Sequence, residues 1–80
     1  MAIDWKETIT FNPQVLTGKA TIRGMRISVE HILRSLSHGI SEAELLREYP
    51  DLKSTDFAAC QAYAADVVAN ERVYPVKASA

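Results

Sequence analysis

Residues 18–46, GKATIRGMRISVEHILRSLSHGISEAELL, contain the change of hydrophobic pattern that decides the fold. Up to Ser28 the β-forming residues come in short pieces that glycine or proline interrupts, at positions 9–11, 20–22 and 26–27. Two or three short strands are therefore expected, in a β-hairpin region that spans residues 9–28.

After Ser28 the apolar residues repeat with a helical period. They follow the i, i+3, i+4, i+7 spacing of one helix face: Val29, Ile32, Leu33 and Leu36. Ser28 is a suitable N-cap for this helix, and Gly39 suits the position just after its end. Ser41 and Glu44 then have the spacing of a capping box, which predicts the start of a second helix. Pro50 ends that helix.

A third helix is expected to begin near Ser54 or Thr55 and to run to about Asn70, with its N-cap at Ser54. Its apolar stripe at helical spacing consists of Phe57, Cys60, Ala64 and Val67. The many alanines of the segment would allow a neighbouring helix to approach closely.

This order of elements predicts an α+β fold, mainly α, in which a short N-terminal β-hairpin precedes a three-helix, helix-turn-helix-like bundle. Residues 1–80 are expected to form a single domain, with the bundle at 29–70 and a C-terminal tail at 71–80. The alternative is that three short helices pack only to bury their apolar residues. A chain of 80 residues buries a small core, and self-association is a common remedy, so a homodimer is expected.

Composition narrows the class of protein. The chain is 48% hydrophobic and 24% charged, which is typical of a folded domain and excludes wholesale disorder. The formal net charge of -1 argues against a surface that is basic all over. A single cysteine, Cys60, cannot form an internal disulfide. Neither a membrane span nor a signal peptide is recognisable, so a cytoplasmic protein without membrane contact is expected.

The polar residues form no recognisable catalytic or metal-binding pattern. His31 and His38 share a helix face, but no third ligand completes a metal spacing. Cys60 lies on an apolar stripe and is interpreted as a buried structural thiol. Four carboxylates are interpreted as a solvated surface: Glu42, Glu44, Glu48 and Asp51. No catalytic residue, metal or cofactor is therefore expected, and the chain is not expected to be an enzyme.

The basic residues near the amino-terminal end have two interpretations. Lys19, Arg23 and Arg26 either bond to backbone carbonyls and acidic residues of the bundle or form a basic tip. Such a tip would contact DNA phosphate or an acidic partner. If DNA is the target, helix-turn-helix geometry adds the start of the third helix, Lys53, Ser54 and Thr55. That helix is poor in base-reading side chains, so a dimer would be needed.

Apolar residues near both termini are candidate partner contacts. Val73, Tyr74 and Val76 lie in the tail, which is either a frayed terminus or a segment that orders on a partner. Trp5 either anchors an interface or caps the small core.

Several short motifs together resemble a known family, the small prokaryotic proteins catalogued as domain of unknown function 433. They are NPQV at 12–15, GKATIRGMRISV at 18–29, GISEAELL at 39–46, YPDL at 49–52 and AYA at 62–64. The resemblance covers roughly residues 9–69. The R-G-x-R-I element and the Y-P-x-L turn make it specific, because they have the family's order and spacing.

The chain departs from the family pattern at four positions: Ala20, Met25 and Ser28 in the hairpin region and Lys53 before the third helix. The resemblance implies a β-hairpin joined to a homeodomain-like bundle, of a kind seen in VapB-type antitoxins. It further implies an antitoxin-like interaction protein that binds and neutralises a PIN-like nuclease toxin and binds its own promoter DNA. The alternatives are a stand-alone helix-turn-helix transcriptional regulator without a toxin, and a subunit that only stabilises a larger assembly.

Overall fold

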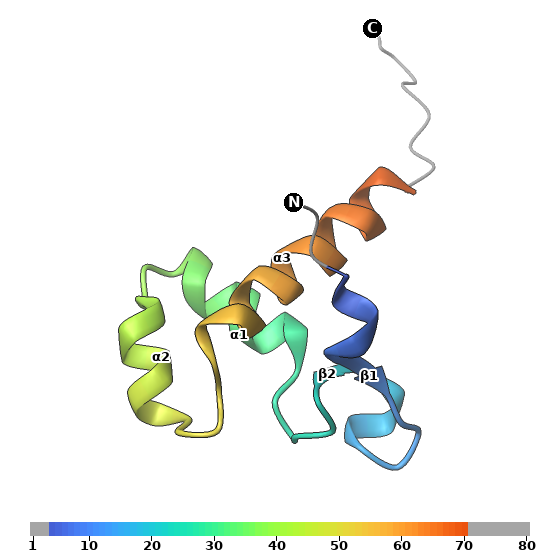
Figure 1. Ribbon diagram of the computed structural model, residues 1–80, viewed down its shortest axis with the longest axis horizontal. Helices are drawn as coiled ribbons and strands as arrows, with labels where there is room; N and C mark the ends of the chain where they lie inside the picture. The colour runs from blue at the N-terminus through green and yellow to red at the C-terminus, as the bar shows by residue number, and fades with distance from the viewer. Residues whose placement is uncertain (1–3, 71–80) are drawn as a thin grey trace, which may run out of the picture.

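A short hairpin and three helices make up the computed structural model, which describes residues 4–70 (Figure 1). The elements in chain order are a 3-10 helix η1 (Trp5–Glu7), strand β1 (Ile9–Phe11), a 3-10 turn η2 (Leu16–Gly18), strand β2 (Ala20–Ile22), and helices α1 (Val29–Ser37), α2 (Glu42–Glu48) and α3 (Ser54–Ala69). The fold is α+β and mainly α, with the N-terminal hairpin before the helices, as the sequence predicts.

The two strands pair antiparallel, with Ile9 opposite Ile22 and Phe11 opposite Ala20. Ile9 and Ile22 are buried, so one face of this small sheet covers the core. Of the two or three strands expected, two are present, and residues 26–27 form no strand. The chain turns back at once after β2, because Arg23 and Gly24 both have positive φ, and only an isolated bridge follows before α1 begins.

The ends of α1 and α2 follow the predicted capping signals. The Ser28 hydroxyl accepts the backbone N–H of His31 at 2.9 Å, which caps the start of α1. At the end of α1, Gly39 takes a φ of 91°, and the N–H groups of Gly39 and Ile40 bond back to the last turn in a Schellman motif. The capping box between Ser41 and Glu44 is complete.

The start of α3 differs from the prediction, which placed a cap at Ser54. The N-cap residue is Lys53, and its backbone N–H donates to the carboxylate of Asp56 at 2.8 Å. Asp56 is 2% exposed, so a buried carboxylate, not a serine hydroxyl, satisfies this helix end. The prediction failed because it expected a serine hydroxyl at the helix start, whereas the acceptor is a carboxylate inside the first turn, which Arg23 also binds.

The core lies between the hairpin, α1, α2 and the first turns of α3. It consists of Ile9, Ile22, Val29, Ile32, Leu45, Leu52, Phe57, Ala59 and Cys60. The predicted stripe of α3 is covered only in part, because Phe57 and Cys60 are buried whereas Val67 is 49% exposed. Within residues 4–70, no helix combines the length and the apolar character needed to cross a membrane.

Candidate functional site

Arg23, a predicted DNA contact, is bonded within the chain. Its Nε and Nη2 atoms donate to the Asp56 carboxylate at 3.2 and 2.8 Å, and Nη2 also donates to the Asp51 carbonyl at 2.6 Å. The Arg23 side chain is 33% exposed and that of Asp56 only 3%. Of the two interpretations given from sequence, the structure therefore shows the first for Arg23, which fastens the turn after β2 to the start of α3.

The charges of this pair stabilise each other. Burial alone would raise the pKa of Asp56, but hydrogen bonds from Arg23 and from the Lys53 backbone outweigh it, so the pKa lies below its ordinary value. The hydrogen bond to Asp56 likewise raises the pKa of Arg23. Both groups are therefore charged at neutral pH, and the arginine fork is occupied by a carboxylate where a phosphate would otherwise bind.

The other predicted DNA contacts are spread over the surface. Lys19 bonds to Glu30 at 3.3 Å and lines a groove beside α1, whereas Arg26 is exposed and lines a separate shallow cleft beside Tyr49 and Asp51. At the start of α3, Lys53, Ser54 and Thr55 are exposed. The structure does not join Lys19 and Arg26 in one patch, and DNA binding stays a prediction.

Trp5 makes contacts within the chain. Its indole Nε1 donates to Asp66 Oδ2 at 2.6 Å, and its ring meets Tyr63 edge-on with centroids 4.9 Å apart. Trp5 thus ties η1 to the second half of α3 and packs against the core. The other candidate partner contacts, Val73, Tyr74 and Val76, lie outside the described residues.

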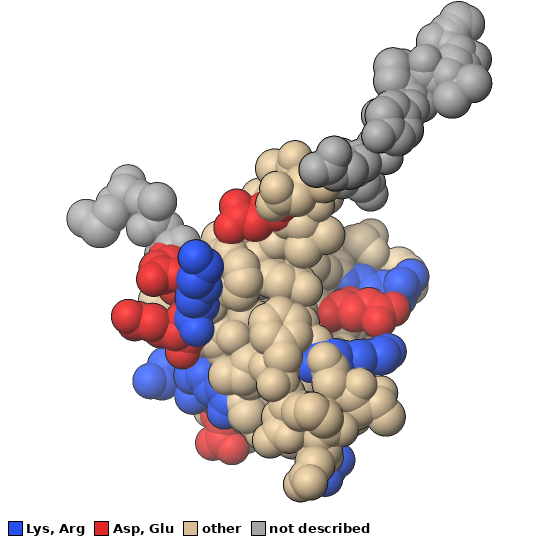
Figure 2. Space-filling view, turned by 90° about the vertical axis from the view of Figure 1, so that its right-hand side faces the viewer, with Lys and Arg blue, Asp and Glu red and all other residues tan. Residues whose placement is uncertain are grey.

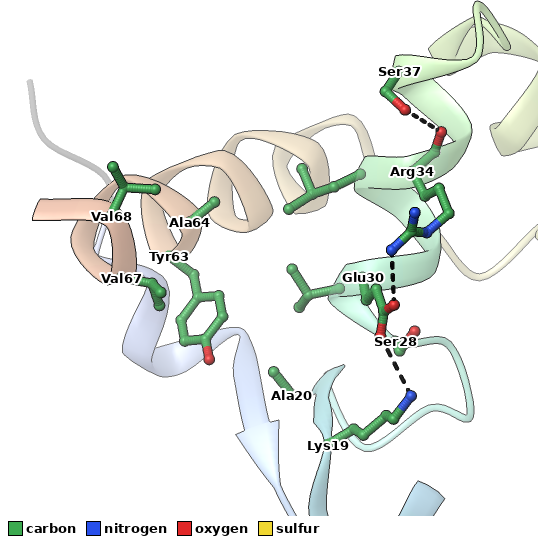
Figure 3. Close-up of a pocket in the computed structure, with 12 residues that line it drawn as sticks. Lys19, Ala20, Ser28, Glu30, Arg34, Ser37, Tyr63, Ala64, Val67 and Val68 are labelled. Atoms are coloured by element: carbon green, nitrogen blue, oxygen red, sulfur yellow. Dashed lines mark hydrogen bonds and ion pairs between the residues drawn. The ribbon is translucent and has the colours of Figure 1, made fainter. Parts of the chain in front are cut away.

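An open groove of about 570 Å³ lies between α1 and the second half of α3. Figure 3 shows Tyr63, Ala64, Val67 and Val68 of α3 on one side of it and the Glu30 and Arg34 side chains of α1 on the other. Val67 and Val68 are 49% and 64% exposed. The groove is therefore floored by apolar side chains that water contacts.

The apolar surface continues from the groove onto the hairpin. Ala20 lines the groove, and Phe11 is opposite Ala20 in the strand register. The ring centroids of Phe11 and Tyr63 lie 5.8 Å apart. Four large hydrophobic residues are exposed within residues 4–70, and three of them belong to this surface: Phe11, Val67 and Val68. We call the surface formed by Phe11, Ala20, Leu33, Tyr63, Ala64, Val67 and Val68 the apolar band.

Charged residues border the apolar band on both sides, as Figure 2 shows. On one side, Glu30 bonds to Lys19 at 3.3 Å and to Arg34 at 3.0 Å; we call these three residues the α1 flank. The hydrogen bond from Arg34, together with that from Lys19, lowers the pKa of Glu30. On the other side lies the η1 segment, which Trp5 joins to Tyr63 and Asp66 of α3. We call its exposed charged residues, Asp4, Lys6 and Glu7, the η1 flank.

The apolar band exists because α1 crosses α3 and does not run along its second half (Figure 3). Helix α1 has 9 residues and stops at the Gly39 motif, whereas α3 has 16. At a rise of about 1.5 Å per residue, α3 extends beyond the elements that pack on its first half. Figure 1 shows the end of α3 projecting past α1. Sequence reasoning missed the band, because no spacing in the sequence shows which side chains the folded chain leaves uncovered.

The nucleophilic and metal-ligating residue types show no site elsewhere in the part of the chain that the structure describes. Cys60 is fully buried, as predicted, and burial raises the pKa of its thiol to about 12. His31 Nε2 lies 3.1 Å from the hydroxyl of Tyr49. No cluster of three or more His, Cys, Asp or Glu residues occurs within residues 4–70. The apolar band is therefore the strongest candidate site.

The chain is similar to known proteins over most of its length. Residues 9–64 match the family described as Protein of unknown function (DUF433). The fold is similar to the crystal structure of a DUF433 member protein from Anabaena variabilis, at 33% sequence identity and a TM-score of 0.72. That match covers 76% of this chain and 60% of the other, so this chain spans less than two-thirds of the solved protein. No curated protein matches the chain.

Proposed function

The chain belongs to the DUF433 family, and we propose that it acts there as an interaction protein of antitoxin type, which binds and neutralises a PIN-like nuclease. In this proposal the chain works by binding and is not an enzyme, and it needs no cofactor. A cytoplasmic location is part of the same proposal. The nuclease as target rests on the family resemblance, and the mode of action rests on the surface of the molecule.

The apolar band carries the proposal. Three exposed hydrophobic residues belong to the band: Val67 and Val68 line a groove of about 570 Å³, and Phe11 lies beside it against Tyr63. An apolar centre with a charged rim is the usual anatomy of a protein–protein interface. Exposed apolar residues that occur singly need no explanation, but a contiguous group points to a partner. A protein that acts by binding other chains requires a surface of this kind.

The test is co-purification of the tagged chain from its native host in mild salt, with the partner identified by mass spectrometry. RNA cleavage by that partner is then measured with and without the chain. We expect a small nuclease in a stable complex and a loss of cleavage when the chain is added in equimolar amount. Recovery of the chain without any nuclease, or a recovered nuclease that cleaves equally well with the chain bound, would contradict the proposal.

A second candidate is a stand-alone DNA-binding regulator, and the exposed Lys53, Ser54 and Thr55 at the start of a helix-turn-helix-like α3 favour it. Arg23 does not favour this candidate, because its guanidinium donates hydrogen bonds to the Asp56 carboxylate. The relevant variant is therefore the double substitution Arg26→Ala and Lys53→Ala, which leaves that pair in place. If these residues bind phosphate, the salt dependence of DNA affinity should fall by about one unit of slope for each residue. An unchanged salt slope would remove both residues from a DNA interface.

A further inference from the structure

The charges beside the apolar band are arranged so that two copies of the band complement each other. We propose that a second copy of this chain occupies the band, related to the first by a two-fold axis that runs along it between the two flanks. The inference rests on the proposed function only in taking the band as a protein interface, and it assigns that interface to a second copy. The nuclease, whose role as target rests on the family resemblance, would then bind the dimer outside the two bands.

The first argument for this assignment is the incomplete cover of the core. In the single chain, Tyr63 and Val67 continue the apolar face of α3 beyond Cys60, but Trp5 and Phe11 cover Tyr63 only in part and Val67 stays 49% exposed. A second band laid on the first would cover these residues and Phe11 in both copies at once. A two-fold interface requires such a surface, because the same patch is used on both sides.

The second argument is charge. The α1 flank holds two cations and one carboxylate, a net charge of +1. The η1 flank holds two carboxylates and one cation, a net charge of -1, and Asp66, which accepts a hydrogen bond from Trp5, adds a third carboxylate on that side. A two-fold axis along the band places each α1 flank opposite the η1 flank of the other copy, twice over. An axis across the band would place like flanks together, which costs energy. The charges therefore select one orientation.

The nuclease and the chain's own residues 71–80 are the competing occupants of the band. Either would cover the apolar side chains, but neither accounts for flanks of opposite net charge. A second copy accounts for both features with no residue beyond those already described. These competitors are outcomes of the test, because each would leave the purified chain as a monomer.

The test is the mass of the purified full-length chain by light scattering and its dissociation constant by sedimentation. We expect twice the chain mass of 8.9 kDa for the unaltered protein. Val68→Asp places a carboxylate in the apolar centre, and it should raise the dissociation constant by about 100-fold. Because Val68 is 64% exposed in the single chain, folding should survive, as circular dichroism will show.

Ile40→Asp is the matched control. Ile40 is the fourth exposed large hydrophobic residue among residues 4–70, at 39% exposure, but it lies in the connection between α1 and α2, outside the band. This variant should dimerise like the unaltered chain. A monomeric unaltered chain, or a Val68→Asp variant that dimerises as well as Ile40→Asp, would overturn the proposal.

Charge reversal tests the orientation. Lys19→Glu makes both flanks negative, so it should weaken the dimer by about 3- to 10-fold at low salt. Adding Glu7→Lys to that variant neutralises the η1 side, Asp66 included, so it removes the repulsion and should recover part of the lost affinity. If the double variant is as weak as or weaker than Lys19→Glu alone, the flanks do not face each other.

The dimer and the nuclease proposals fail in different measurements. A monomeric chain that still blocks RNA cleavage would remove the second copy and leave the proposed function standing. A stable dimer of the predicted orientation that blocks no nuclease would support the second copy and contradict the proposed function.

Discussion

The two halves of α3 have opposite surroundings, although the second half is the more apolar in sequence. The first half places Asp56, Phe57, Ala59 and Cys60 in the core, whereas the second half leaves Val67 and Val68 in contact with water. The first half is also fastened by Arg23, a residue that lies 33 positions away in the chain. The second half is held by Trp5, through one hydrogen bond to Asp66 and one ring contact with Tyr63.

This difference shows that an apolar stripe on a helix indicates a need for cover but does not say what provides it. In the first half of α3 the cover is the hairpin and the other two helices. In the second half the cover is incomplete, because the end of α3 projects past α1 (Figure 1) and Val67 and Val68 stay exposed. An apolar stripe that the rest of the chain leaves uncovered is thus a sign of an interface.

The largest expected effect comes from truncating one apolar residue in each half. Phe57→Ala removes a side chain that is 1% exposed and should lower the free energy of unfolding by about 3–5 kcal/mol. Val67→Ala, on the same stripe, should lower it by less than about 1 kcal/mol. Urea unfolding followed by circular dichroism measures both. Both substitutions should be made in a chain that also carries Val68→Asp. Self-association is weak in that chain and therefore does not add to the measured stability.

A Phe57→Ala chain that does not fold at all still agrees with this expectation, because a small domain has little stability to spare. Equal losses for Phe57→Ala and Val67→Ala in the monomeric background would contradict it. That result would mean that the second half of α3 is covered within a single chain.

The second prediction concerns the ion pair that fastens the first half. Asp56→Asn removes the charge partner of Arg23 and weakens the cap on the Lys53 N–H. The loss in unfolding free energy at pH 7 should be about 2 kcal/mol, because hydrogen bonds between charged groups contribute more than neutral ones. Asp66→Asn is the control in the other half, and its exposed position should keep the loss below about 0.5 kcal/mol.

The same pair predicts a dependence on pH with a definite sign. The pKa of Asp56 is lower in the folded chain than its ordinary value, which for aspartate is about 3.9. The stabilisation is therefore complete above that ordinary pKa and is lost as the pH falls through the lower folded value. The stability difference between the unaltered chain and Asp56→Asn should shrink from pH 6 toward acid. A difference that stays constant on acidification would show that Asp56 carries no such charge pairing.

Local signals in the sequence predicted most of the fold. The cap at Ser28, the turn at Gly39 and the capping box at Ser41 each depend on neighbouring residues only, and all three are present. The cap of α3 could not be predicted in the same way. Its acceptor, Asp56, is held in place by Arg23, and only the folded chain brings those two residues together.

The candidate site was less predictable than the fold, for a related reason. Lys19 and Arg23 were grouped because both are basic and near a turn, but one bonds to Glu30 of α1 and the other to Asp56 of α3. The apolar band combines residues from β1, β2, α1 and α3, and no single motif brings them together. A surface of that kind depends on which side chains are left uncovered, and sequence spacing does not contain this information.

The smallest expected effect tests how the second half of α3 is held. Trp5→Phe keeps an aromatic ring on Tyr63 but removes the indole donor to Asp66, so the loss in unfolding free energy should be about 0.5–1 kcal/mol. The loss should be local: amide hydrogen exchange should quicken in the last turns of α3 and stay unchanged around Phe57, which has its own cover. Equal acceleration in both halves would mean that α3 opens as one unit. The two halves of α3 would then differ in solvent exposure but not in local stability.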